Sequence, residues 1–191
     1  MKYRVTVFLL SYLSLNSMLP LELMAAQIEG VSFREQVQIG RTHLVLNNVA
    51  LMRYQYVIKA MVAGLYLGEG VKPQDTLSDV PKRLEIHYFW DLAAKDIVDA
   101  SEKLLEQNVP ASRLKAIRDQ IAQMNSLYEN VKAGDTYTLT YIPGVGTELA
   151  LNGKKKGMVA GADFALAYFT IWFGKKPMDI AMRDELLKQR G

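Results

Sequence analysis

The chain has 191 residues, with 23 lysines and arginines, 20 aspartates and glutamates, and no cysteine. A net charge of +3 is too small for the dense basic face that binds a phosphate backbone, so we expect no nucleic-acid partner. The lack of cysteine excludes disulfides, and the hydrophobic core alone must stabilise the fold.

The first 26 residues have the pattern of a secretory signal peptide. Lys2 and Arg4 form a basic start, an apolar run follows over residues 5–15, and Ala25 and Ala26 offer a small-residue cleavage site. The apolar run is shorter than the about 20 residues of a spanning helix. A buried N-terminal helix is the alternative. We expect residues 1–26 to be removed on export and residues 27–191 to form one soluble periplasmic domain without a stable membrane span.

The first part of this domain has the residue alternation of β-strands. Residues 31–39 and 43–48 flank a predicted turn at Gly40, and residues 52–67 form a long apolar run. If that run is one strand, Arg53, Val57, Lys59 and Met61 share a face. Gly64 interrupts the run, where we expect a bulge or a close backbone approach.

The remaining periodicity alternates between strands and helices. Residues 83–90 read as a strand with Leu84, Ile86, Tyr88 and Trp90 on one side. Apolar residues then recur at spacings of three and four over residues 93–108 and 110–128, which predicts two helices. Strands return over residues 136–142 and 147–151, and helices over 162–173 and 177–188. This order predicts an α+β fold with helices on one face of an antiparallel sheet.

Several local motifs, in this order, resemble the chalcone isomerase-like family over residues 28–188. The motifs are Leu46-Asn47-Asn48, Leu51-Met52-Arg53, Lys59, Ala63-Gly64-Leu65-Tyr66-Leu67, the helix end at Asn108, Gly134-Asp135, and Ile171-Trp172-Phe173-Gly174 up to Pro177. The resemblance implies an open-faced β-sandwich, in which a large antiparallel sheet curves around helices and a ligand cleft lies between them.

The same resemblance argues against catalysis. Chalcone isomerases use an arginine together with threonine, tyrosine and asparagine side chains. Matching the motifs places Arg53 near that arginine, but Met61, Ala93 and Ala100 fall where the other three are expected. A thioether and two methyl groups cannot orient a ketone or a water by hydrogen bonding. We therefore expect no catalytic residues, no cofactor and a binding protein, with an intramolecular lyase or isomerase that uses a rearranged polar set as the alternative.

A fatty-acid-binding branch of the family implies a role for the retained arginine. Arg53 would hold a carboxylate in a bidentate fork, while Val57 and Met61 line an apolar wall and Tyr66 or Tyr88 offers a hydroxyl. We therefore predict a small amphipathic acid, such as a fatty acid, as the ligand.

Two other interpretations stay open at this point. Arg53 could pair with Glu85 or Glu35 and bind nothing, or the chain could be an envelope module that binds a protein partner. We expect no metal site, because His43 and His87 are far apart in the sequence and no cysteine or spaced carboxylate cluster accompanies them.

Overall fold

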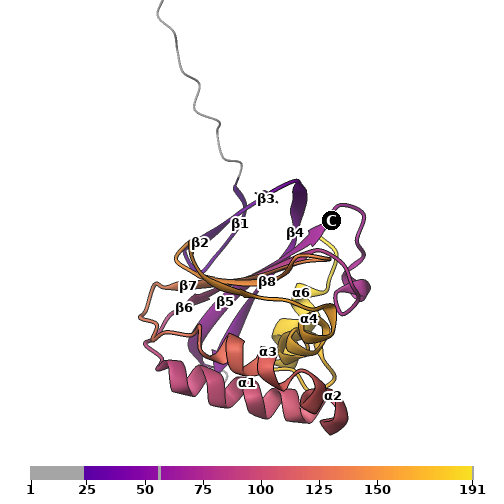
Figure 1. Ribbon diagram of the computed structural model, residues 1–191. Helices are drawn as coiled ribbons and strands as arrows, with labels where there is room; N and C mark the ends of the chain where they lie inside the picture. The colour runs from indigo at the N-terminus through magenta and orange to yellow at the C-terminus, as the bar shows by residue number, and fades with distance from the viewer. Residues whose placement is uncertain (1–23, 56, 191) are drawn as a thin grey trace, which may run out of the picture.

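A seven-stranded antiparallel sheet forms the centre of the computed structural model, which describes residues 24–55 and 57–190 (Figure 1). Strands that follow one another in the chain are neighbours in the sheet. They are β3 (Gln36–Ile39), β4 (Thr42–Tyr54), β5 (Ile58–Gly68), β6 (Lys82–Tyr88), β7 (Thr136–Ile142), β8 (Gly146–Leu151) and β9 (Lys154–Val159). The predicted α+β class with a large antiparallel sheet is confirmed.

Helices cover one face of this sheet (Figure 1). α1 (Ala94–Asn108), α2 (Ala111–Ala116) and α3 (Arg118–Asn125) lie between β6 and β7 in the chain. α4 (Ala162–Tyr168), α5 (Thr170–Phe173) and α6 (Ile180–Leu186) follow β9, and a short 3-10 helix, η1 (Pro73–Asp75), precedes β6. The main core lies between the helices and this face, to which Leu84, Ile86 and Tyr88 point as predicted. Trp90, predicted on the same side, lies beyond the end of β6 and is 42% exposed.

A separate hairpin of β1 (Met24–Ile28) and β2 (Val31–Arg34) covers the opposite face of the sheet. Its Phe33 is buried against Leu46, Val62 and Tyr66. Gly64 makes this approach possible, because a Cβ at that position would lie 2.6 Å from Phe33 Cδ1. The close approach predicted at Gly64 is therefore confirmed, and the sheet is sandwiched between the hairpin and the helices.

The predicted signal peptide falls for the most part on residues that the structure does not describe. Its last three residues, 24–26, belong to β1, where Met24 pairs with Arg34 and Ala26 with Phe33. Cleavage after Ala26 would remove these pairs, so the hairpin as described needs a cleavage site before Met24. Removal of a signal peptide stays a prediction.

The prediction that residues 52–67 form a single strand is wrong. β4 ends at Tyr54, Gln55 has a left-handed φ of 48°, and β5 starts at Ile58 as the antiparallel partner of β4. Because the chain reverses here, Arg53 pairs with Lys59 and Met52 with Met61 across the hairpin. The expectation that Arg53, Val57 and Met61 share one strand face is wrong for the same reason. The turn has no glycine, proline or asparagine that would have marked it.

The predicted helix over residues 110–128 is interrupted. Ile117, with φ −112° and ψ 18°, separates α2 from α3. Its side chain is 3% exposed and belongs to the main core. The break at Ile117 thus separates two short helices, while the Ile117 side chain stays packed in the main core.

Two asparagines on β4 fasten the last helix to the sheet. Asn47 Nδ2 donates hydrogen bonds to the carbonyls of Leu186 at 2.6 Å and Lys188 at 3.0 Å, and Asn48 Nδ2 donates to the carbonyl of Glu185 at 2.9 Å. The last carbonyls of a helix lack i+4 partners within the helix, and Asn47 supplies a donor to one of them, that of Leu186. Asn48 adds a side-chain donor to the Glu185 carbonyl, which also accepts from the amide of Lys188. This contact gives a physical role to the Leu46-Asn47-Asn48 motif.

Replacing Asn48 with alanine should therefore lower the free energy of unfolding by about 0.5–1.5 kcal/mol, since it removes one hydrogen bond between β4 and α6. Denaturant unfolding of the variant measures the loss. Gln38→Ala is the control, because Gln38 makes an exposed hydrogen bond to Gly40. Equal stability of the two variants would contradict this role for Asn48.

A buried lysine lies at the start of β6. Lys82 is 0% exposed, and its Nζ donates to the carbonyls of Ser78 at 2.7 Å and Val80 at 3.2 Å. The ammonium also lies 4.9 Å from the centre of the Tyr141 ring. Burial lowers the pKa of Lys82 from 10.5 to about 8, with the nearby Asp79 opposing the shift.

Because the folded pKa of Lys82 lies below the unfolded value, the unfolded chain binds more protons between these two pH values. The free energy of unfolding should therefore rise with pH from about 8 to 9, by up to about 1 kcal/mol per pH unit. Closer to pH 10 the buried tyrosines, whose pKa values burial raises, oppose this rise. Chemical denaturation across this window measures the slope. The slope should be absent in Lys82→Met, and a slope that persists in that variant would assign it to another group.

Candidate functional site

The structure places the predicted anchor, Arg53, away from the helix-covered face. Its neighbour Met52 packs into the main core, so Arg53 points to the opposite side of the hairpin. There Arg53 Nη2 lies 3.4 Å from Glu29 Oε1, and Lys59 Nζ pairs with Glu29 Oε2. Arg53 thus pairs with neither Glu85 nor Glu35, the two carboxylates suggested by the sequence.

Two more predicted ligand residues also lie outside the space between the sheet and the helices. Val57 is 73% exposed in the β4–β5 turn. Tyr66 is buried with Phe33 beneath the β1–β2 hairpin, and burial, together with the charge of Glu85, raises the pKa of its hydroxyl. The structure therefore does not bring Arg53, Val57 or Tyr66 together with Met61 and Tyr88, the other two predicted ligand residues.

Met61 and Tyr88 do meet, in a largely enclosed cavity of about 20 Å³ between the sheet and the helices. Such a volume is about that of one water molecule. The sheet contributes Met61, Ile86, Tyr88, Tyr137, Leu139 and Leu149 to its wall, and the helical layer contributes Ile97, Ser101, Tyr128, Trp172 and Met178. The cavity is thus apolar with a small set of hydroxyls and one indole.

The polar groups around this cavity are uncharged hydrogen-bond donors. Burial raises the pKa of Tyr88, of Tyr128 and of Tyr168, so these phenols stay protonated. The Tyr168 hydroxyl donates to the Tyr128 hydroxyl at 3.0 Å. Trp172 Nε1 is buried and has no hydrogen-bond partner among the described residues.

An unpaired buried donor costs about 1–3 kcal/mol, so the Trp172 indole marks a place where an acceptor is missing. The residue is 7% exposed and lines the cavity. A ligand oxygen in the cavity would remove this cost.

A second, open pocket adjoins the enclosed cavity. Its volume is about 250 Å³, and its lining residues, which carry almost no polar surface, are Met52, Tyr54, Ala60, Met61, Trp90 and Leu92. Met61 lines both spaces. A shift of the flexible Met61 side chain would therefore connect the open pocket, which we call the mouth, with the enclosed cavity.

Sequence reasoning missed most of this wall. Ala93 and Ala100, the positions matched to the catalytic tyrosine and asparagine, are exposed, and on α1 the cavity is instead lined by Ile97 and Ser101. Trp172 falls in the predicted helix over residues 162–173, and no pattern marked it as a cavity residue. The helical period of α1 carried the signal for Ser101, since it lies four residues after Ile97 on the buried face.

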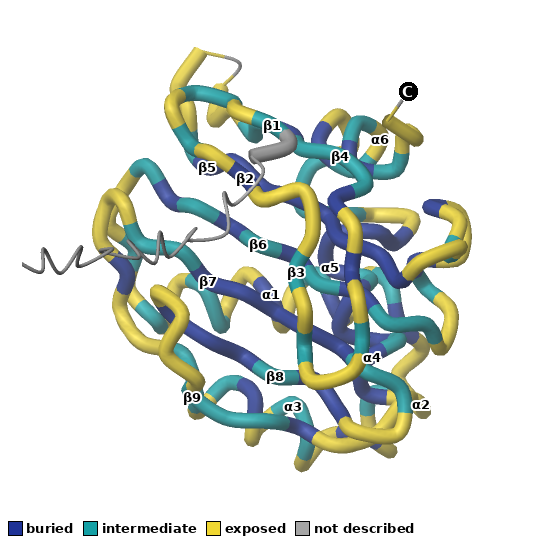
Figure 2. The backbone as a smooth tube through the Cα atoms, turned by 90° about the horizontal axis from the view of Figure 1, so that it is seen from above, coloured by how far each residue is buried: buried dark blue, intermediate teal, exposed yellow. Residues whose placement is uncertain are grey.

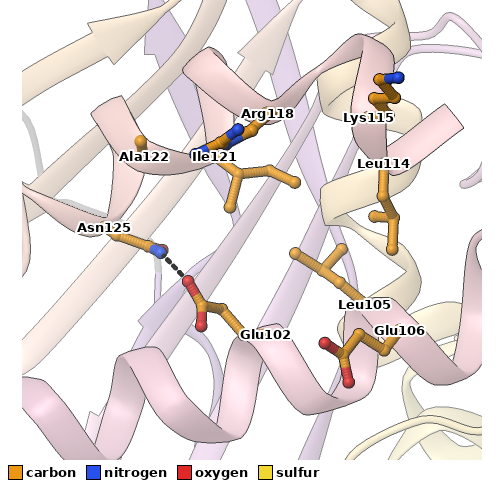
Figure 3. Close-up of a pocket in the computed structure, with 9 residues that line it drawn as sticks. All are labelled: Glu102, Leu105, Glu106, Leu114, Lys115, Arg118, Ile121, Ala122 and Asn125. Carbon is orange, nitrogen blue, oxygen red and sulfur yellow. Dashed lines mark hydrogen bonds between the residues drawn. The ribbon is translucent and has the colours of Figure 1, made fainter. Parts of the chain in front are cut away.

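A larger pocket lies elsewhere, as a groove of about 620 Å³ between α1 and the α2–α3 pair (Figure 3). Leu105, Leu114 and Ile121 form its apolar part, and Glu102 accepts a 2.7 Å hydrogen bond from Asn125 Nδ2 at one end. Glu106 on one wall and Lys115 and Arg118 on the other give it both charges. This groove, unlike the cavity, is open to solvent along its length.

Two kinds of site are absent from the part of the chain that the structure describes. None of its helices combines the length and hydropathy of a membrane-spanning segment. No three histidine, aspartate or glutamate side chains within residues 24–55 and 57–190 are grouped as metal ligands.

Comparison with known proteins identifies a matching family and a solved structure of similar fold. A model of the family described as chalcone isomerase-like matches residues 25–188. Among solved structures, a fatty-acid binding protein from Arabidopsis thaliana is similar with a TM-score of 0.62 and 17% sequence identity, over 83% of this chain and 92% of the other. No curated protein matches the sequence.

Proposed function

Because the chain belongs to the chalcone isomerase-like family and encloses an apolar cavity, we propose that it binds a fatty acid or a similar amphipathic acid between the sheet and the helices. The ligand enters at the mouth beside Trp90 and passes Met61. Its hydrocarbon chain lies along the mouth and its oxygen atoms reach the inner donors. We place this activity outside the cytoplasm, in line with the predicted export.

The observation that carries the proposal is the unpaired Trp172 Nε1 in the cavity wall. The nearby phenols stay protonated, because burial raises their pKa values. These donors are neutral, and the lining contains no cation. They suit a neutral acceptor, such as a protonated carboxyl group or a carbonyl, since a buried carboxylate without a paired cation is strongly disfavoured.

The cavity must expand to receive such a ligand. Its present volume of about 20 Å³ admits little more than a water molecule. Met61 and Met178 line it, and unbranched thioether side chains change rotamer readily. Binding therefore proceeds by displacement of these two side chains from the space that connects the cavity with the mouth.

This arrangement assigns the carboxyl group to Trp172 and the phenols and leaves Arg53 out of the ligand site. Replacing Trp172 with phenylalanine should weaken fatty-acid binding by roughly 2- to 10-fold, the effect of one lost hydrogen bond. Arg53→Ala should leave affinity unchanged. Isothermal titration of both variants measures the difference, and a loss confined to Arg53→Ala would instead support the carboxylate anchor predicted from the sequence.

Native mass spectrometry of the purified protein, followed by denaturing extraction, tests the function itself. The expected result is a released acid or related lipid in a one-to-one complex, and titration should show weaker binding of the acid as pH rises while a fatty alcohol binds equally at each pH. An empty protein with no affinity for either compound would refute the proposal.

A protein-binding role is the second candidate, favoured by the contrast between the small cavity and the open groove between α1 and the α2–α3 pair. Apolar side chains and charged side chains of both signs line the groove. Such a lining can contact the apolar and the charged side chains of a bound peptide segment. If the protein binds no lipid, co-purification of a partner that Leu114→Asp releases would support this role.

A further inference from the structure

Large apolar side chains are exposed together at one end of the sheet. They are Tyr54 and Val57, which are 53% and 73% exposed, and Ile58 and Trp90, which are 37% and 42% exposed. We call these four residues the apolar tip. The ring centres of Tyr54 and Trp90 lie 6.4 Å apart in an edge-on arrangement, so the β4–β5 turn and the loop after β6 form one surface.

This surface is an end of the molecule rather than part of a flat face. Figure 2 shows the β4–β5 turn as an exposed extremity of the chain. The other exposed large apolar residues of the described chain, Val45, Val145 and Ile180, belong to separate elements. Single exposed apolar side chains are normal, whereas a group of four that includes tryptophan and tyrosine marks an interaction site.

Two basic side chains, Arg53 and Lys59, and two carboxylates, Glu29 and Asp91, lie beside the apolar tip. Arg53 and Lys59 share Glu29, which leaves one positive charge in excess within this ion-pair cluster. Both basic side chains are about half exposed. Asp91, which follows Trp90, accepts a hydrogen bond from the amide of Ala133 and is held in its own loop.

We propose that the apolar tip docks onto the surface of a phospholipid bilayer that contains anionic lipid. Tryptophan and tyrosine favour the boundary between headgroups and hydrocarbon, where the ring is buried and its polar edge stays hydrated. Val57 and Ile58 enter the outermost hydrocarbon, while Arg53 and Lys59 meet lipid phosphates. Only two basic groups meet the anionic leaflet, so docking is reversible.

Docking at this end would also turn the mouth towards the lipid. Tyr54 and Trp90 belong both to the apolar tip and to the mouth. A molecule leaving the bilayer would then enter the apolar pocket without crossing water. The docking claim itself stands apart from the proposed binding function, because the apolar tip is exposed whether or not the cavity is filled.

The two tryptophans of the chain allow a direct test. In Trp172→Phe, the half-exposed Trp90 is the only indole and reports on the apolar tip. Vesicles of phosphatidylglycerol and phosphatidylethanolamine should shift its emission to shorter wavelength, and lipids brominated near the headgroup should quench it. Vesicles of phosphatidylcholine alone should do so less, and added salt should weaken the effect.

A matched pair of charge variants, made in this background, completes the experiment. Val57→Asp should abolish the shift and the co-sedimentation with vesicles, whereas Val145→Asp, which changes another exposed valine, in the β7–β8 turn, should leave both intact. Both variants carry the same N-terminal segment, so its own lipid affinity cancels in the comparison. An unchanged Trp90 emission with vesicles, or equal effects of the two variants, would overturn the proposal whether or not the protein binds a fatty acid.

Discussion

Truncation of Met61 to alanine should destabilise the ligand-free protein by about 2–5 kcal/mol and at the same time improve fatty-acid binding. Met61 is 8% exposed and packs between the enclosed cavity and the mouth. Its removal merges the two spaces, so the ligand no longer has to displace a side chain. Thermal unfolding with and without added fatty acid measures both effects, and the melting temperature of the variant should respond more strongly to ligand than that of the unmodified protein.

Met124→Ala is the matched control for this prediction. Met124 is 0% exposed in the same core but lines neither the cavity nor the mouth. Its truncation should cost a similar free energy of unfolding without increasing the response to ligand. If both variants respond equally to fatty acid, the gain comes from general loosening of the core and not from an opened passage.

Replacement of Phe33 with alanine should destabilise the protein by about 3–5 kcal/mol and release the β1–β2 hairpin from the sheet. The Phe33 ring is 1% exposed and lies against Gly64, Leu46 and Tyr66. Urea unfolding measures the stability. Limited proteolysis should show new cleavage near Gly30, in the turn between β1 and β2.

A double-mutant cycle with Gly64→Ala separates this contact from general loss of apolar burial. Alone, Gly64→Ala should cost about 1–3 kcal/mol, because the added Cβ would lie 2.6 Å from Phe33 Cδ1. In the Phe33→Ala background the obstacle is gone, and the same change should cost less. Strict additivity of the two substitutions would contradict direct contact between the ring and the glycine.

Residue alternation was enough to predict the inward face of β6. Leu84, Ile86 and Tyr88 lie on the helix-covered face as the period of two requires. The turn at Asn152 and Gly153 was marked by residues that accept a left-handed backbone, and both have positive φ values. In this strand and this turn, the local amino-acid sequence was therefore enough to predict the structure.

The β4–β5 turn carried no such signal. Its residues are tyrosine, glutamine and valine, which favour strands, so the reversal after Tyr54 depends on pairing between residues 42–54 and 58–68 rather than on local preference. The error had a direct consequence for the site. It placed Arg53 and Met61 on one face, although the hairpin puts them on opposite faces.

The cavity wall depends on helix rotation and on contacts between distant segments. One residue along a helix turns the side chain by about 100 degrees, so a shift from Ala100 to Ser101 exchanges solvent for the interior. Trp172 reaches the cavity only because α5, α1 and the sheet meet there. Periodicity predicted the helices that carry these residues but could not distinguish core packing from a binding surface.

Quenching of Trp172 by a brominated fatty acid tests the central claim most directly. In Trp90→Phe, the remaining indole belongs to the cavity wall, where its Nε1 has no partner among the described residues. The proposed function predicts saturable quenching at one ligand per chain and its loss when an excess of unlabelled acid is added. Emission that stays unchanged while the protein remains folded would show that no fatty acid reaches the cavity, and would contradict the account.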